Sequence, residues 1–412
     1  MLNQLLTTVI KKGSISLIDP TGMARQFGSG EPHLILKFHD NHAAFEMGLD
    51  PELKFGELFT DGRITVEKGD IAAVLALISQ NLASAPPSRT MEVVRMLRQH
   101  LRRLHQFNPA GRAKKNVAHH YDLSSQLYAL FLDADRQYSC AYFPNGDETL
   151  EEAQVAKKRH IAAKLLLDRP GMKVLDIGCG WGGLALDLAG EARAQVLGVT
   201  LSEEQISVAR ERCGNARLTD RCRFELVDYR ALSGTYDRIV SVGMFEHVGL
   251  PHYPAFFRKV RSLLADDGVM LLHTIGRLDG PGATNPWIAK YIFPGGYVPA
   301  LSEVTHAIEK SGLVITDVEV LRLHYAETLK EWRRRFNKHR AEIARLYDER
   351  FCRMWEFYLA GAEMAFRHSG QAVFQIQLAK RLDAVPLTRD YMTEAERRMA
   401  VPGTGPRPIR AA

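Results

Sequence analysis

Between residues 173 and 276 the sequence alternates apolar runs of strand length with segments of helical pattern. Five apolar runs have the composition of buried strands: KVLDIGC, AQVLGVT, CRFELVD, YDRIVSVGM and GVMLLHTIG. The segments that predict helices between them are GGLALDLAGEA, SEEQISVARERC and YPAFFRKVRSLL. A regular succession of strand and helix indicates a parallel sheet covered by helices on both faces. We therefore expect an α/β fold in this part of the chain.

Segments on either side complete the expected organisation. VITDVEVL and AVFQIQLAKR have the pattern of further strands, and residues 328–368 between them predict long helices rich in aromatic side chains. The first 85 residues predict a small α+β unit, with strands in SISLIDP, ARQFGS and HLILKFHD and a helix over 70–83. We place an N-terminal α+β domain at residues 1–108, the main domain at 109–390 and a disordered tail at 391–412.

The segment MEVVRMLRQHLRRLHQF, residues 91–107, predicts a basic amphipathic helix whose leucines share one face. Two interpretations stay open. The helix either docks on its own protein with its arginines in solvent, or it contacts anionic lipid headgroups. The formal net charge of +6 suits either an anionic membrane surface or a nucleic acid, so it does not distinguish between these two kinds of partner.

Composition narrows the class of protein. The five cysteines are odd in number and show no CxxC spacing, which argues against a disulfide framework or a zinc knuckle and fits a reducing cytosol. No apolar run is long enough to span a membrane, and no basic region precedes an apolar core at the start. We expect a cytoplasmic protein that would reach any lipid from the membrane surface.

A glycine-rich turn, VLDIGCGWGG at 174–183, directly follows the first strand and precedes a helix. Glycines let the backbone approach a ligand closely, and Gly178, Gly180 and Gly183 also satisfy the GxGxxG pattern of dinucleotide sites. That pattern expects an acidic residue at the tip of the second strand. Here the second strand closes with VTLSEEQ, and no acidic residue stands at its tip. Asp176 instead precedes the glycines, an arrangement typical of S-adenosylmethionine-dependent methyltransferases. We favour a methyltransferase over a dehydrogenase, and Asp228 at the end of the third strand would accept from an adenine amino group.

A carboxylate stands at an unusual place in the fourth strand segment, RIVSVGMFEHVG. Glu246 and His247 appear where the chain leaves the sheet. In open α/β sheets ligands bind outside the carboxyl ends of the strands. Glu246 is therefore a candidate functional residue, with helix capping as the alternative.

From residue 116 onward the sequence closely resembles the cyclopropane fatty acid synthase family, which includes the mycolic acid cyclopropane synthases. The resemblance rests on HYDLSSQLYALFLD, YSCAYF, VLDIGCGWGG, GVTLSEEQ, YDRIVSVGMFEHVG, LLHTIG, YIFPGG and HYAETL. It implies a Rossmann-like, seven-stranded class I methyltransferase sheet with helical insertions. The separate N-terminal domain resembles the branch that acts on bacterial phospholipids. The implied reaction transfers the methyl of S-adenosylmethionine to a cis double bond in a membrane acyl chain and closes a cyclopropane ring.

The resemblance also implies which residues surround the cofactor. They come from the YSCAYF segment, the glycine-rich turn, and the ends of the second and third strands. The set is Tyr138, Ser139, Val174, Leu175, Asp176, Ile177, Gly178, Cys179, Gly180, Trp181, Gly182, Thr200, Leu201, Ser202, Glu203, Glu204, Gln205, Asp228, Tyr229 and Arg230. Arg230 stands where the family varies.

A bicarbonate ion is implied as the base that removes a proton before ring closure. Its ligands map to Cys140, Glu246, His273, the backbone of Ile275, and Tyr325. Ring closure needs a base beside the new methyl group and needs water kept out. Each residue also has an ordinary explanation, since a buried cysteine or histidine most often only packs in a core. A zinc site is a further alternative that suits a sulfonium reaction poorly.

One departure concerns Ala362 in YLAGAEMAFR, where many relatives carry a cysteine. With Ala362 in place, that helix offers no thiol to the reaction. The main alternative function keeps the same cofactor but yields a methyl- or methylene-branched acyl chain. An RNA methyltransferase would need clustered basic and aromatic residues, which we do not find, so no nucleic-acid partner is expected. A binding protein with a defunct methyltransferase fold would have damaged glycines or lack the base site, and in this sequence both are intact. Oligomeric state, including a homodimer, stays open.

Overall fold

The structure is a computed structural model that describes residues 2–84, 106 and 124–400. Two compact units make up the chain. One takes residues 1–102, 283–294 and 326–371, and the other takes residues 103–282, 295–325 and 372–412. Apart from residue 106, the predicted basic helix over 91–107 lies outside the described residues, as do residues 108–123 and the end of the predicted tail, 401–412.

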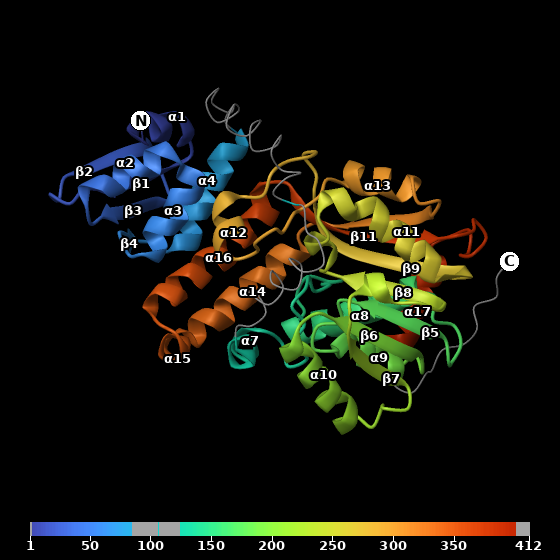
Figure 1. Ribbon diagram of the computed structural model, residues 1–412. Helices are drawn as coiled ribbons and strands as arrows, with labels where there is room; N and C mark the ends of the chain where they lie inside the picture. The colour runs from blue at the N-terminus through green and yellow to red at the C-terminus, as the bar shows by residue number, and fades with distance from the viewer. Residues whose placement is uncertain (1, 85–105, 107–123, 401–412) are drawn as a thin grey trace. The chain divides into compact units, whose positions relative to one another are not determined.

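The second unit contains a seven-stranded sheet, as the sequence predicts (Figure 1). Its strands are β5 (Lys173–Ile177), β6 (Gln195–Thr200), β7 (Cys222–Leu226), β8 (Tyr236–Val242), β9 (Leu264–Arg277), β10 (Val314–Leu321) and β11 (Gln371–Ala379). Their order is β10-β11-β9-β8-β5-β6-β7. The pairs from β7 to β9 are parallel, and β10 pairs antiparallel with β11. The predicted α/β fold is confirmed.

Helices cover both faces of this sheet. They are α8 (Leu150–Lys164), α9 (Gly183–Gly190) and α10 (Glu203–Asn215) on one face, and α11 (Tyr253–Leu263) and α13 (Leu301–Glu309) on the other. The unit also contains α7 (Ser125–Phe131) and α17 (Asp390–Ala400). Successive strand residues point to opposite faces. Leu175 accordingly packs in the core shared with α11 and α13, and Val174 packs in the core shared with α8, α9 and α10. Buried apolar residues on both faces explain the continuous hydrophobic runs in the sequence.

Helix α17 corrects the prediction of a disordered tail from residue 391. Its first turn is anchored because Tyr391 and Met392 are buried against Leu166 and Val269. The helix also contacts α8. Glu396 also lies 2.7 Å from His160 on α8, and Met399 packs against the core beneath α8, so contacts along the length of α17 hold it in place.

The first unit is built from segments that are distant in sequence. Its sheet has the order β2-β1-β3-β4, in which β1 pairs parallel with β3 and the other pairs are antiparallel. The elements are α1 (Leu2–Val9), β1 (Gly13–Ile18), β2 (Ala24–Ser29), β3 (His33–Phe38), α2 (Asn41–Leu49), α3 (Pro51–Thr60), β4 (Ile64–Lys68), α4 (Ile71–Ser84), α12 (Pro286–Tyr291), α14 (His324–Lys338), α15 (Arg340–Leu346) and α16 (Glu349–His368). Helix α16 packs on α3 and α4, and its Ala360 joins the N-terminal core. A boundary drawn at a single residue therefore does not describe this unit.

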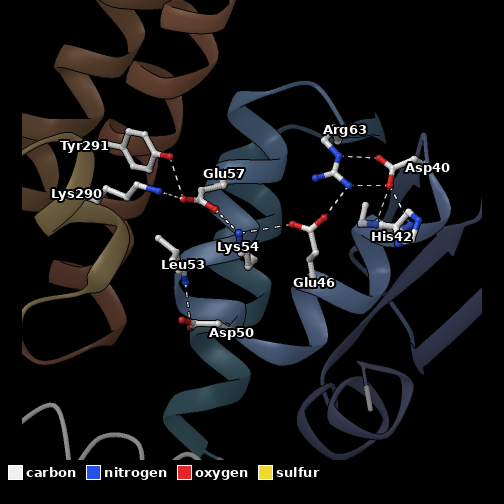
Figure 2. Close-up of polar contacts among 11 residues, drawn as sticks. Asp40, His42, Glu46, Asp50, Leu53, Lys54, Glu57, Arg63, Lys290 and Tyr291 are labelled. Atoms are coloured by element: carbon white, nitrogen blue, oxygen red, sulfur yellow. Dashed lines mark hydrogen bonds and ion pairs between the residues drawn. The ribbon is translucent and has the colours of Figure 1, made fainter.

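A network of oppositely charged side chains links α12 to α3 (Figure 2). Glu57 on α3 accepts hydrogen bonds from Lys290 Nζ at 2.6 Å and from Tyr291 Oη at 2.9 Å. Lys54 Nζ lies 2.8 Å from the other oxygen of Glu57. Burial alone would raise the pKa of Glu57, but the hydrogen bonds from Lys290 and Lys54 lower this pKa to about 2. Glu57 is therefore ionised and binds α12 through Lys290 and Tyr291.

Candidate active site

A cavity of about 150 Å³ opens where β5, β6, β7 and β8 end. Strand β5 pairs with β6 on one side and with β8 on the other, so the chain order reverses here. Such a switch point is where open α/β sheets bind ligands. The lining includes these residues of the predicted cofactor set: Tyr138, Ser139, Asp176, Ile177, Gly178, Cys179, Gly180, Trp181, Thr200, Leu201, Gln205, Asp228, Tyr229 and Arg230.

The glycine-rich turn forms the floor of this cavity through backbone conformations that other residues rarely adopt. Gly178, Gly180 and Gly182 have φ angles of +86°, +54° and +83°. A Cβ on Gly178 would lie 2.7 Å from Met244, whereas a Cβ on Gly180 would meet no protein atom within 4 Å. Gly178 is thus required by protein packing, while the space above Gly180 is part of the open cavity.

Asp176 lies at the floor of the cavity and is almost completely buried, with 2% of its surface exposed. Burial raises the pKa of Asp176 to about 7, and the nearby Lys157 opposes this effect. Lys157 is itself buried and donates to Gln137 Oε1 at 2.6 Å and to Ser139 Oγ at 2.9 Å. These hydrogen bonds fix the segment that carries Tyr138 and Ser139 against the cavity.

The ends of the second and third strands are held by local hydrogen bonds. Thr200 Oγ1 donates to Gln205 Oε1 at 2.9 Å, which joins the tip of β6 to the first turn of α10. At the tip of β7, Asp228 receives hydrogen bonds from the Arg230 side chain at 2.9 and 2.6 Å. Burial would raise the pKa of Asp228, but the Arg230 hydrogen bond lowers it, so this carboxylate is ionised at the cavity wall.

Some members of the predicted set do not line the cavity. Val174 and Leu175 lie in the two apolar cores, and Gly182 and Ser202 cap helices α9 and α10. Glu203 and Glu204 follow in the first turn of α10, where Glu204 accepts from the Trp181 ring nitrogen at 3.0 Å. The lining also includes residues outside the predicted cofactor set: Arg136, Gln137, Gly183, Leu184, Val199, Val227, Val242, Gly243, Met244, His247 and Val248. Of these, only Gly183 and His247 stand out in the sequence. Most of these lining residues lie close to predicted residues in the sequence, and that proximity is the signal that could have found them.

Glu246 lies just beyond the cavity, in the 3-10 turn η2 (Phe245–His247) that follows β8. Its Oε1 accepts a hydrogen bond from the backbone N–H of Ile275 on β9 at 2.5 Å. Its Oε2 is buried and has no hydrogen-bond partner among the described residues. Burial raises the pKa of Glu246 to about 6. The carboxylate therefore reaches across to a neighbouring strand, a contact that helix capping does not explain.

His273 lies one strand over and faces a polar partner. It is buried on β9 opposite Val242, and Gly243 N donates to its carbonyl oxygen at 2.9 Å. Its Nδ1 lies 3.1 Å from Nε2 of Gln375 on β11. Burial holds the pKa of His273 well below its usual range, so the imidazole is neutral. The pairing of β8 with β9 thus brings His273, Ile275 and Glu246 together near the carboxyl end of β8.

Cys140 and Tyr325 reach the same unit from two other segments. Both side chains are buried, and Cys140 Sγ donates to the carbonyl of Ala141 at 3.2 Å. The segment after Cys140 meets the segment before Tyr325, because Phe143 N donates to His324 Nδ1 at 3.0 Å. The two residues are therefore carried by segments in direct contact.

Two negative findings apply to the described ranges. No three His, Cys, Asp or Glu side chains are grouped there so as to hold a metal ion. No helix in the same ranges has the length and apolar character needed to cross a membrane.

Comparison with known proteins gives consistent matches. The family profile described as mycolic acid cyclopropane synthetase matches residues 109–376. A "probable fatty acid methyltransferase" of Pseudomonas putida is 38% identical over 338 residues, covering 79% of this chain and 82% of the relative. The "cyclopropane-fatty-acyl-phospholipid synthase" of Escherichia coli K12 is 44% identical over 264 residues, covering 64% and 67% respectively. A solved mycolic acid cyclopropane synthase complexed with SAH and CTAB is 36% identical with a TM-score of 0.61, covering 66% of this chain and 99% of that structure.

Proposed function

Since this chain belongs to the mycolic acid cyclopropane synthetase family of S-adenosylmethionine-dependent methyltransferases, we propose that it forms cyclopropane rings on unsaturated phospholipid acyl chains. The observation that carries the proposal is the position of Glu246. Strand β8 ends at Val242, which lines the cavity, and the chain continues through the lining residue Met244 into the turn that carries this buried carboxylate. A proton-accepting site thus adjoins a methyl-donor site.

The proposed reaction needs both sites. An alkene attacks the electrophilic methyl of the sulfonium, which leaves a cation on the acyl chain. Loss of one proton from the transferred methyl group then closes the ring, so the chain gains a CH₂ group in total. A base must lie close to that methyl group, and water must be excluded because it would trap the cation. The burial of Glu246, His273 and Cys140 suits such a dry site.

A bound bicarbonate would supply an oxyanion to accept this proton. Two observations on the chain fit such an anion. Glu246 has a buried, unpartnered oxygen and a raised pKa, so it can share a proton with a second oxyanion. Neutral His273 can donate one N–H without adding a charge. We assign Cys140, Glu246, His273, Ile275 and Tyr325 to hold the ion. The cavity residues of the predicted set are assigned to the cofactor.

A methyl- or methylene-branched product is the second candidate function. It is supported by the similarity to the probable fatty acid methyltransferase of Pseudomonas putida, which covers more of this chain than the match to the Escherichia coli protein does.

Lipid extracts of cells that express the protein test the choice. Cyclopropane formation predicts that monounsaturated phospholipid chains gain the mass of one CH₂ group and show ring protons by NMR. A methylene branch gives the same mass with alkene protons, and a saturated methyl branch is heavier by two hydrogens. Unchanged lipids, with Gly180→Ala as the blank, would refute both candidates.

We further propose that the protein works at the inner face of the cytoplasmic membrane. The basic segment 91–107 supports this, since each Lys or Arg near an anionic surface contributes about 1 kcal/mol. Replacing Arg98, Arg102 and Arg103 together by Glu should release the protein from anionic vesicles, while replacement by Lys should retain binding. Equal vesicle binding by both variants would contradict a membrane role for this segment.

A further inference from the structure

Two buried glutamines interrupt the apolar pattern of strand β11. Gln375 and Gln377 have 0% and 1% of their surface exposed. Phe374 and Ile376, the residues that alternate with them, pack in the apolar core of the opposite face. A buried amide costs about 1–3 kcal/mol when it is left without hydrogen bonds. Each glutamine therefore calls for an explanation by the partners that it binds.

Gln377 has a structural explanation. Its Nε2 donates to the backbone carbonyl of Lys164 at 2.5 Å and to Tyr391 Oη at 2.7 Å. Its Oε1 accepts from Thr316 Oγ1 at 2.8 Å. Both ends of the amide are satisfied, and the side chain joins β11 to α8 and α17.

Gln375 is different because only one end of its amide is used. Its Nε2 lies 3.1 Å from Nδ1 of His273, while its Oε1 has no hydrogen-bond partner among the residues that the structure describes. The burial of this amide is thus compensated mainly at His273. An apolar side chain would fill the same space without leaving an oxygen unsatisfied. The contact with His273 is the feature that an apolar residue could not supply.

We propose that Gln375 is a positioning residue that donates to Nδ1 of His273 and thereby keeps the ring proton on Nε2. The inference rests on the proposed function, since it takes His273 as part of the base site. An amide nitrogen carries two hydrogens and cannot accept, so the ring nitrogen that faces it must be the acceptor. A neutral imidazole has one N–H, which then belongs to Nε2.

The charges around His273 agree with a neutral ring. Burial lowers the pKa of His273 most strongly, and the positive Lys157 and Lys164 lower it further. With the proton on Nε2, the ring offers a bound oxyanion a hydrogen-bond donor. The opposite tautomer would turn a lone pair toward the same oxyanion and repel it. Partners behind a ligating histidine commonly control its orientation and tautomer in this way.

The direct test is the ¹⁵N NMR spectrum of histidine-labelled wild-type protein without cofactor or added bicarbonate. His273 is assigned by the signals that disappear in His273→Gln. The protonated and unprotonated nitrogens of a neutral imidazole have well separated shifts. We expect His273 to carry its proton on Nε2. A proton on Nδ1 in the wild-type protein would overturn the inference, whatever the product of the enzyme.

Variants separate positioning from packing. Gln375→Glu replaces the donor by a carboxylate that can only accept, so it should move the His273 proton to Nδ1. Gln375→Leu should leave the tautomer unfixed and lower kcat about 10- to 100-fold, with unchanged affinity for S-adenosylmethionine. The matched control is Gln377→Met, which should lose stability but keep the Nε2 tautomer. Wild-type kcat and tautomer in Gln375→Leu would contradict the inference, and the wild-type spectrum still decides if the variants fail to fold. An Nε2 tautomer without lipid product would refute the proposed function alone.

Discussion

At the scale of single residues, two glycines of the glycine-rich turn have different roles, one in ligand binding and the other in folding. A Cβ on Gly180 enters open cavity, whereas a Cβ on Gly178 collides with Met244. We predict that Gly180→Ala loses most of its affinity for S-adenosylmethionine and that its positive φ costs about 1–2 kcal/mol of stability. Gly178→Ala should instead lose stability first. Calorimetric titration and thermal unfolding of both variants measure the difference. Near-normal affinity in Gly180→Ala would place the ligand elsewhere.

The role assigned to Glu246 predicts a loss of rate with retention of the fold. Gln at this position keeps an oxygen that can accept from Ile275 N–H, but it cannot carry the charge or share a proton with an anion. We expect Glu246→Gln to bind S-adenosylmethionine normally and to turn over about 10²–10⁴-fold more slowly. Addition of His273→Gln should cost much less than a multiplicative loss, because both residues serve one site. Wild-type turnover in Glu246→Gln would refute the assignment.

The same substitution has a pH-dependent effect on stability, which serves as its control. The folded pKa of Glu246 is about 6, above the ordinary value of 4.5, because the carboxylate is buried. Between these pH values the native state binds the proton more tightly than the unfolded chain, so the free energy of unfolding falls as pH rises. The cost reaches about 2 kcal/mol above pH 6. Glu246→Gln should lack this fall in urea unfolding measured from pH 4 to pH 7.

The sequence predicts some site residues better than others for a physical reason. Glu246 is visible because a carboxylate at the end of an apolar strand is out of place unless a ligand or partner is there. Gln375 gives no comparable signal, since its importance depends on β11 lying beside β9, a neighbour about 100 residues away in the chain. Contacts between distant strands are set by topology, which a local pattern does not contain.

At the scale of elements, the salt-bridge cluster of Figure 2 predicts how α12 is held on α3. The folded pKa of Glu57 is about 2, below its ordinary value of 4.5, so the ionised carboxylate stabilises the fold above pH 4.5 and this contribution is lost as pH falls toward 2. Lys290 is 57% exposed at its side chain, which keeps the effect small. We expect Glu57→Gln to lose about 1–2 kcal/mol at pH 7 and much less at pH 3.

Urea unfolding at the two pH values measures this prediction. Glu52→Gln removes an exposed charge from the same helix and controls for the change in net charge. An equal loss of stability at pH 7 and pH 3 in Glu57→Gln would show that packing, and not the ionised carboxylate, holds α12.

At this scale too, helices and strands are predicted well from the sequence where buried apolar residues recur at a clear spacing. All seven strands of the large sheet were expected because each is an apolar run bounded by turns or helices. Helices α2 and α3 were not placed, although Asp40 and Asp50 cap them and Pro51 stands in the first turn of α3. Helix α17 was missed because its contacts, from Tyr391, Met392 and Glu396, are made with segments that are distant in sequence.

At the scale of the whole molecule, the order of motifs identifies the family, but the sequence does not reveal how the first unit is assembled. Its later contributions, residues 283–294 and 326–371, lie within the span of the family match at 109–376. Trp287 on α12 packs against Phe357 on α16 with ring centroids 4.8 Å apart, and Phe357 in turn contacts Phe55 on α3. A discontinuous unit of this kind is recognised only from contacts, because each of its segments alone has an ordinary helical pattern.

In the proposed reaction, one proton leaves the transferred methyl group as the ring closes. The most direct measurement supplies purified protein with vesicles of monounsaturated phospholipid and S-adenosylmethionine that carries a CD₃ group. We expect acyl chains that gain CD₂, lose their alkene signals and show ring signals by NMR. Chains that retain all three deuterons, that keep an alkene, or that do not change at all would contradict the proposed reaction.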